Sequence, residues 1–121
     1  MLGYCTGAVW ILNITTIKNN INMKLYVDDI RIAPEGWTQA WNADEAVEFL
    51  ETGTVTELSL DHDLGDVDQP TGYDIMCWIE EMMYNEKFPL PEINFHTANP
   101  TGRDNMQACL DAILRRQNNG N

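Results

Sequence analysis

The chain has 121 residues, 44% of them hydrophobic, which is the length and composition of one globular domain. Its net charge of −12 excludes a basic surface for duplex nucleic acid, so a phosphate ligand would have to be held by a metal ion or by a few placed arginines. No apolar run approaches the ~18 residues of a membrane-spanning helix. Cys5, Cys77 and Cys109 form no C-x-x-C motif, which favours reduced, buried thiols and a cytoplasmic location.

Residues 1–22 differ in character from the rest of the chain. The apolar run at residues 8–12 has no basic residue before it and is therefore a poor signal peptide, and residues 13–22 are polar. A pattern typical of a folded domain begins at Met23. We therefore expect residues 1–22 to be an atypical extension, with the native start at Met23, followed by a catalytic domain over residues 23–117 and a disordered tail over residues 118–121.

The first predicted elements are a strand, a turn and a second short strand. Residues 24–27 are mostly apolar and run into Asp28 and Asp29, which is typical of a buried strand that leads into a functional loop. Residues 30–36 contain proline and glycine and predict a turn, and residues 37–41 predict the second strand. Fewer than about ten residues join the two strands, which is short for a parallel crossover. The second strand is therefore either marginal or at an edge of the sheet.

Beyond residue 41, predicted helices and strands alternate. Asn42, Thr71 and the turn at residues 99–102 carry the signals that open a helix. The predicted helices cover residues 43 to about 52, 72–85 and 103 to about 116, and the predicted strands cover residues 57–60 and 93–96. This alternation predicts a small three-layer α/β domain with a mostly parallel four-stranded sheet and about three helices.

Polar side chains follow three of the predicted strands, at the point where each strand ends. Because the carboxyl ends of parallel strands meet at one edge of a sheet, we expect these side chains to share that edge. Both histidines of the chain are among them. The residues concerned are Asp28, Asp29, Arg31, Asp61, His62, Asp63, His96, Thr97, Asn99 and Arg103.

These residue types together can process a phosphate ester. Carboxylates such as those of Asp28 and Asp29 bind Mg²⁺ or Mn²⁺, which bring phosphate oxygens to an acidic site. His62 and His96 can transfer protons. Arginines grip phosphate oxygens with two parallel hydrogen bonds, which here suggests Arg103 with Arg31 as a second contact.

Four segments, in chain order, resemble the cyclic-phosphate-processing receiver-like domain family. They are residues 24–31 (KLYVDDIR), residues 58–65 (LSLDHDLG), residues 71–74 (TGYD), and residues 96–100 (HTANP) with Gly102, Arg103, Asn105 and Met106 after them. The resemblance extends from about residue 23 to about residue 114. It implies a flavodoxin-like or receiver-like fold in which the helix after the first strand is missing, and this explains the short first connection.

The resemblance also implies roles for the site residues. The acid pair of ordinary receivers, which holds Mg²⁺, is matched by Asp28 and Asp29, and the phosphoacceptor position is matched by Asp61 or Asp63. The histidines that distinguish the family are matched by His62 and His96. The resemblance implies action on cyclic phosphates of nucleotides or of RNA ends. Residues expected to bind the phosphate are Arg31, Arg103, Asn99 and Asn105.

The leading hypothesis is therefore metal-assisted hydrolysis of a cyclic phosphodiester. Its metal ligands are expected to be Asp28, Asp29 and Asp61, and its catalytic residues His62, His96, Asp61 and Asp63. The alternative is a non-catalytic receiver that binds or sequesters a phosphorylated nucleotide or accepts a phosphoryl group. The sequence has no lysine after its last predicted strand, where a phosphoacceptor receiver normally carries one, and this argues against the phosphoacceptor.

Overall fold

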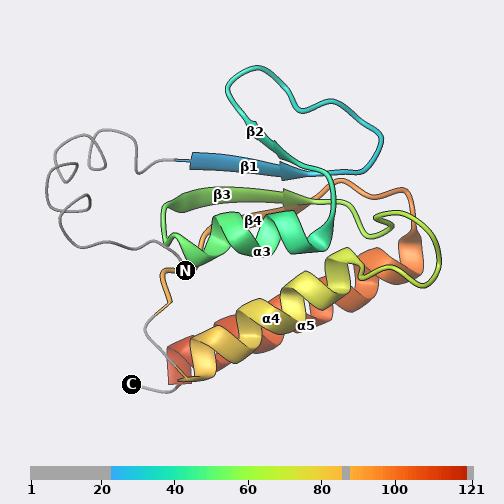
Figure 1. Cartoon of the computed structure of the whole chain (residues 1–121). Helices are drawn as coiled ribbons and strands as arrows, with labels where there is room; N and C mark the ends of the chain where they lie inside the picture. The colour runs from blue at the N-terminus through green and yellow to red at the C-terminus, as the bar shows by residue number, and fades with distance from the viewer. Residues whose placement is uncertain (1–22, 86–87, 120–121) are drawn as a thin grey trace, which may run out of the picture.

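The computed structural model describes residues 23–85 and 88–119. They form β1 (Met23–Val27), β2 (Thr38–Ala40), α3 (Ala43–Glu51), β3 (Val55–Leu60), α4 (Gly72–Asn85), β4 (Glu92–Phe95) and α5 (Pro100–Asn119) (Figure 1). Each element was expected from the sequence, with boundaries that differ by a few residues. The expectations for residues 1–22, which include Cys5 and a native start at Met23, fall outside the described residues and stay predictions.

The four strands form one parallel sheet in the order β2-β1-β3-β4. β1 and β3 are the central strands, and this explains why Leu25, Val27 and residues 58–60 are buried. β2 has three residues and lies at an edge, which was one of the two alternatives that the short connection from β1 left open. This confirms the α/β class and the four-stranded sheet and shows that every strand pair is parallel.

Local signals in the sequence begin the helices. The Asn42 side chain accepts a hydrogen bond from the Glu45 backbone N–H at 2.8 Å, and the Glu45 carboxylate accepts one from the Trp41 N–H at 2.8 Å, which is a capping box at the start of α3. Asp74 accepts a hydrogen bond from the backbone N–H of Thr71 at 2.7 Å, just before α4. Of these backbone groups, the Glu45 N–H lies in the first turn of α3, where a helix start leaves N–H groups without partners in the helix.

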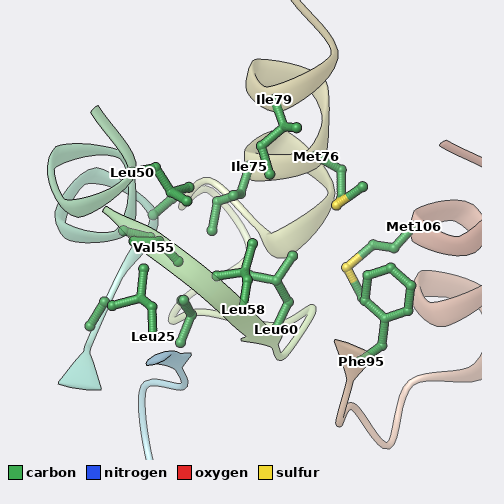
Figure 2. Packing of buried hydrophobic residues seen from close by; sticks show 14 of the residues in the cluster. Leu25, Leu50, Val55, Leu58, Leu60, Ile75, Met76, Ile79, Phe95 and Met106 are labelled. Atoms are coloured by element: carbon green, nitrogen blue, oxygen red, sulfur yellow. The ribbon is translucent and has the colours of Figure 1, made fainter. Parts of the chain in front are cut away.

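One hydrophobic core lies between the sheet and the helices (Figure 2). Leu25, Leu58 and Leu60 reach it from the central strands and have no exposed surface. Figure 2 shows Met106 of α5 packed beside Phe95 of β4. α3 contributes Ala43, Ala46 and Leu50, and α4 contributes Ile75, Met76 and Ile79.

The number of layers differs from the expectation. Core residues of all three helices join the same face of the sheet, which carries Leu58 and Leu60, so the described residues form two layers rather than three. The physical reason is the first connection: the described residues 28–37 contain no helix, so no crossover helix covers the opposite face between β1 and β2. The side chains of Tyr26 and Ser59 lie on that opposite face, because side chains alternate along a strand.

Two further expectations are refined by the described residues. α5 continues to Asn119, two residues into the segment that was assigned to a disordered tail. Cys109 is buried as expected, whereas Cys77 is partly exposed. Among the described helices, none is long and apolar enough to span a membrane.

Candidate active site

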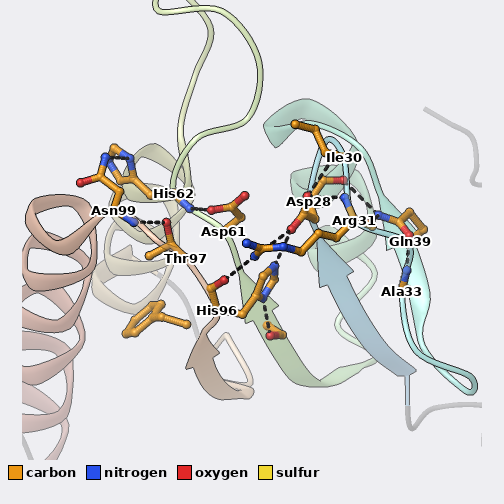
Figure 3. Close-up of polar contacts among 12 residues, drawn as sticks. Asp28, Ile30, Arg31, Ala33, Gln39, Asp61, His62, His96, Thr97 and Asn99 are labelled. Atoms are coloured by element: carbon orange, nitrogen blue, oxygen red, sulfur yellow. Dashed lines mark hydrogen bonds and ion pairs between the residues drawn. The ribbon is translucent and has the colours of Figure 1, made fainter.

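The carboxyl ends of β1, β3 and β4 meet at one edge of the sheet, where the polar residues were expected (Figure 3). Backbone hydrogen bonds fix the residues that follow the strands. The Asp61 N–H donates to the Val27 carbonyl at 3.0 Å, and the His96 N–H donates to the Leu60 carbonyl at 2.9 Å. The segments that carry the acids and the histidines are therefore held side by side by the sheet itself.

Three carboxylates of this edge form a cluster. Asp28, Asp29 and Asp61 each offer an oxygen, and these oxygens lie within 4.8 Å of one another. The resemblance left open whether Asp61 or Asp63 takes the phosphoacceptor position, and Asp61 was expected as the third metal ligand. In the structure Asp61 joins the acid pair, while the carboxylate of Asp63 contacts His62 instead.

Asp28 is the most buried member, with 1% of its side chain exposed. Its Oδ1 accepts hydrogen bonds from the backbone N–H groups of Ile30 at 2.8 Å and Arg31 at 2.7 Å. Burial raises the pKa of Asp28, but these two bonds, together with the hydrogen bond and charge of His96, outweigh it and hold the pKa below its usual value. Asp28 is therefore ionised at neutral pH and acts only as a hydrogen-bond acceptor.

Both ring nitrogens of His96 are engaged. Its Nε2 lies 3.0 Å from Oδ2 of Asp28, and its Nδ1 lies 2.7 Å from Oγ of Ser59. One face of the imidazole stacks on the Tyr26 ring, with centroids 4.3 Å apart and planes 4° apart. His96 is therefore held on two edges and one face by Ser59 of β3, by Tyr26 of β1 and by Asp28, which directly follows β1.

His62 has a different environment, in which only one ring nitrogen is paired with a carboxylate. Its Nδ1 lies 2.9 Å from Oδ1 of Asp63, and 17% of its side chain is exposed. The hydrogen bond from His62, which outweighs burial, lowers the pKa of Asp63, with a further contribution from Asn99. Ionised Asp63 can only accept, so Nδ1 of His62 carries the hydrogen and Nε2 is left as an acceptor. Within the described chain, Nε2 of His62 has no hydrogen-bond partner.

Two glycines allow the segment at Asp61 and His62 to pack closely against the helices. A Cβ on Gly102, in the first turn of α5, would overlap the imidazole ring of His62. A Cβ on Gly72, the first residue of α4, would overlap the carbonyl oxygen of Asp61, and the Gly72 N–H donates to the His62 carbonyl at 2.8 Å. These contacts explain why glycine is needed at both positions.

The residues expected to bind phosphate lie in different surroundings. Arg31 is at the acid cluster, where its Nη1 donates to the His96 carbonyl at 2.8 Å and lies 3.8 Å from Oδ2 of Asp28. Arg103 uses one Nη1 to hold the Phe95 carbonyl at 3.0 Å. Asn99 accepts a hydrogen bond from the Gly102 N–H at 3.0 Å, and its amide lies 3.4 Å from the Asp63 carboxylate. Asn105 is exposed on α5.

Three residues that shape this edge were not expected from the sequence. Ser59 and Tyr26 hold His96, and Gln39 bridges the loop after β1 by donating to the carbonyls of Asp28 and Arg31, each at 3.0 Å. The sequence did carry an indication that Ser59 has a partner, because it is a polar residue between two leucines of a buried strand. Nothing in the sequence pattern indicated that Tyr26 would stack on a histidine 70 positions later.

A parallel sheet with helices between its strands, and with aspartates gathered at the carboxyl edge, defines a receiver-like α/β domain. The family model for the cyclic-phosphate processing receiver domain matches residues 23–112. The chain belongs to this family. No curated protein and no solved structure gave a significant match.

Proposed function

We propose that the chain is a phosphoesterase that hydrolyses cyclic phosphates of nucleotides or of RNA ends, assisted by Mg²⁺ or Mn²⁺. The family links the fold to cyclic-phosphate processing. The observation that carries the catalytic part is the pairing of His62 with Asp63, because it leaves Nε2 of an imidazole unpaired in the residue that directly follows Asp61 of the acid cluster. An imidazole with one nitrogen held by a carboxylate and the other unpaired is the arrangement of a general base.

The carboxylate cluster fits a divalent cation. Asp28, Asp29 and Asp61 supply the hard oxygen ligands that Mg²⁺ and Mn²⁺ prefer, and their oxygens lie within 4.8 Å of one another. A bound cation would neutralise the three carboxylates and attract the negative phosphate, which the carboxylates alone would repel. These three residues are therefore the proposed ligands.

The proposed reaction is the addition of water to a cyclic phosphodiester. Nε2 of His62 takes a proton from the attacking water as the new P–O bond forms. The P–O bond to one sugar oxygen then breaks, and this oxygen takes up a proton, for which the His62 imidazolium is a donor. Asp63 keeps its hydrogen bond to Nδ1 and stabilises the imidazolium while the proton is held. The product is a phosphate monoester.

Arg31 is the proposed phosphate contact. Its guanidinium lies at the acid cluster, and one of its nitrogens is held by the His96 carbonyl. The remaining donors of a guanidinium are suited to the equatorial oxygens of a phosphate. Asn99, just before α5, lies beside His62 and Asp63, and Arg103 follows in the first turns of α5. Both are proposed as supporting contacts, and Asn105 as a more distant one.

The experiment is a turnover assay on the whole chain with 2′,3′-cyclic nucleotides, 3′,5′-cyclic nucleotides, cyclic dinucleotides and RNA ending in a 2′,3′-cyclic phosphate. Each substrate is offered in large excess with Mg²⁺, with Mn²⁺ and with EDTA. A phosphoesterase converts many equivalents of at least one substrate, and EDTA suppresses the conversion. Retention of at most one equivalent of unaltered substrate would instead establish the sequestering module.

The net charge and the cysteines bear on the proposed ligand and on the proposed cellular location. The acidic surface, with its net charge of −12, suits single nucleotides or RNA ends rather than duplex nucleic acid. Reduced cysteines, of which Cys109 is buried and unbridged in the described residues, suit a cytoplasmic protein.

A further inference from the structure

The hydrogen bonds to Asp28 leave this carboxylate one acceptor position. An ionised carboxylate has about four lone-pair positions, two on each oxygen. Both positions of Oδ1 are taken by the backbone N–H groups of Ile30 and Arg31. One position of Oδ2 is taken by Nε2 of His96 at 3.0 Å. Nη1 of Arg31 lies 3.8 Å from Oδ2, which is beyond hydrogen-bond distance. The position that remains for a cation is therefore the second one on Oδ2.

Asp28 determines the direction of the two hydrogen bonds that link it through His96 to Ser59. Asp28 accepts two backbone N–H groups at Oδ1, and a carboxylate that binds a cation carries no proton, so it only accepts and Nε2 of His96 must carry a hydrogen. In the neutral imidazole, Nδ1 is then an acceptor, and the Ser59 hydroxyl donates to it over 2.7 Å. Ser59 is largely buried in the central strand β3, so its hydroxyl is held in place.

The sheet fixes the geometry of the ring. Ser59 pairs in register with Tyr26 on the neighbouring strand β1, and the Tyr26 ring stacks on the imidazole of His96 with the planes 4° apart. The stack sets the plane of the imidazole, and the Ser59 hydroxyl sets its rotation within that plane. Figure 3 shows His96 below Asp28, with the hydrogen bond between them drawn as a dashed line.

We propose that Ser59 is a positioning residue of the metal site: through His96 it fixes Oδ2 of Asp28, the oxygen by which Asp28 binds the divalent cation. The inference rests on the proposed function in one respect, which is that Asp28, Asp29 and Asp61 hold a cation. It gives His96 a role in orienting Asp28 rather than in proton transfer, and it leaves proton transfer to His62. Partners that orient a metal ligand typically change metal affinity about 10–100-fold when they are removed.

The test measures Mn²⁺ binding to the whole chain by calorimetry, without substrate. We expect Ser59→Ala to raise the Kd for Mn²⁺ about 10–100-fold. Ser59→Thr keeps the hydroxyl and suits a strand, so it should bind Mn²⁺ nearly as the wild type does. Thr56→Ala is the matched control, because it removes an exposed hydroxyl from the same strand, and it should leave the Kd unchanged.

A second measurement, by NMR on the metal-free protein, determines which ring nitrogen of His96 carries the hydrogen. Only two histidines are present, so ¹⁵N-labelled histidine gives two sets of ring signals. In the wild type, the His96 signals should show the hydrogen on Nε2 and a hydrogen-bonded Nδ1, and Ser59→Ala should shift Nδ1 alone. A hydrogen on Nδ1 in the wild type would overturn the inference whatever the metal data show.

The outcomes separate this inference from the proposed function. If the wild type binds Mn²⁺ and Ser59→Ala binds it equally well, Ser59 has no positioning role, and the proposed metal site is unaffected. If the wild type binds no Mn²⁺, the proposed metal site is wrong and the role of Ser59 in it is wrong too. A weaker Kd for Ser59→Ala, restored in Ser59→Thr, supports both.

Discussion

Gly102 lies directly beneath the imidazole ring of His62, so close that a Cβ at this position would overlap the ring carbons. The contact joins the first turn of α5 to the residue that follows Asp61 at the end of β3. It sets where the His62 ring lies relative to the acid cluster, because the ring cannot move toward the helix. A side chain at residue 102 must therefore displace the ring outward.

Gly102→Ala is expected to lower the turnover of a cyclic phosphate about 100-fold, the loss that follows when a catalytic group is misplaced by roughly 1 Å. The fold should be retained, because the His62 side chain is partly exposed and can rotate away. Thr101→Ala, at the exposed neighbouring position of the same helical turn, is the control and should turn over substrate normally. Full activity of Gly102→Ala would show that the position of the ring does not matter.

Asp28→Asn should make the free energy of unfolding depend less on pH in the acid range. Burial raises the pKa of Asp28, but hydrogen bonds from the backbone of Arg31 and Ile30 and from His96 outweigh burial and hold the pKa below the usual 3.8. A carboxyl with a lowered folded pKa stabilises the fold above its unfolded pKa, and this contribution is lost as the pH falls through the folded pKa. The wild type should therefore lose stability below about pH 4.

Urea unfolding at several pH values between about 6 and about 3 checks this expectation. Because asparagine does not titrate, the free energy of unfolding of Asp28→Asn should fall less steeply over the acid range. Asp29→Asn, which removes the neighbouring charge but takes no part in these hydrogen bonds, controls for the loss of one charge. Parallel curves for the wild type and Asp28→Asn would contradict the account of this carboxylate.

Cys109 should resist alkylation in the folded protein. Burial, together with the nearby charge of Glu80, raises the pKa of its thiol to about 12, so almost no thiolate is present at neutral pH. Iodoacetamide followed by mass spectrometry should leave Cys109 unmodified until urea is added, whereas the partly exposed Cys77 should be modified without urea. Equal rates at the two cysteines under native conditions would mean that the packing between α4 and α5 is looser than described.

Leu58→Ala should destabilise the fold by about 2–5 kcal/mol, the usual effect of emptying a buried leucine site. Leu58 lies in the central strand β3 and has no exposed surface. Val67→Ala is the control, because Val67 is fully exposed in the loop before α4 and should change stability little. Chemical unfolding of both variants measures the difference, and a loss below about 1 kcal/mol for Leu58→Ala would contradict the described core.

The sequence predicted which residues share the carboxyl edge, because this follows from strand order alone. Asp28 and Asp61 each come directly after a buried strand, and parallel strands bring such positions together. The separate environments of His62 and His96 could not be predicted. They depend on side-chain contacts across the fold, namely Gly102 under one ring and Tyr26 against the other, and no periodicity encodes these contacts.

The layer arrangement shows the same limit. The short connection between β1 and β2 indicated a missing helix, but the faces on which the remaining helices pack depend on the direction of each crossover. α3 connects β2 to β3 and α4 connects β3 to β4, so both cross the sheet in the same direction and pack on one face. The order of the strands, which local sequence patterns do not specify, was needed to deduce this.

The most direct test of the central claim is the kcat/KM of His62→Gln on the substrate that the wild type turns over, at saturating Mn²⁺. The claim is that His62, held by Asp63, transfers the proton when a cyclic phosphate is opened beside the acid cluster. We predict a loss of about 10²–10⁴-fold, the usual contribution of a general acid–base, with an unchanged Kd for Mn²⁺. A His62→Gln protein that opens the cyclic phosphate at the wild-type rate would contradict the claim.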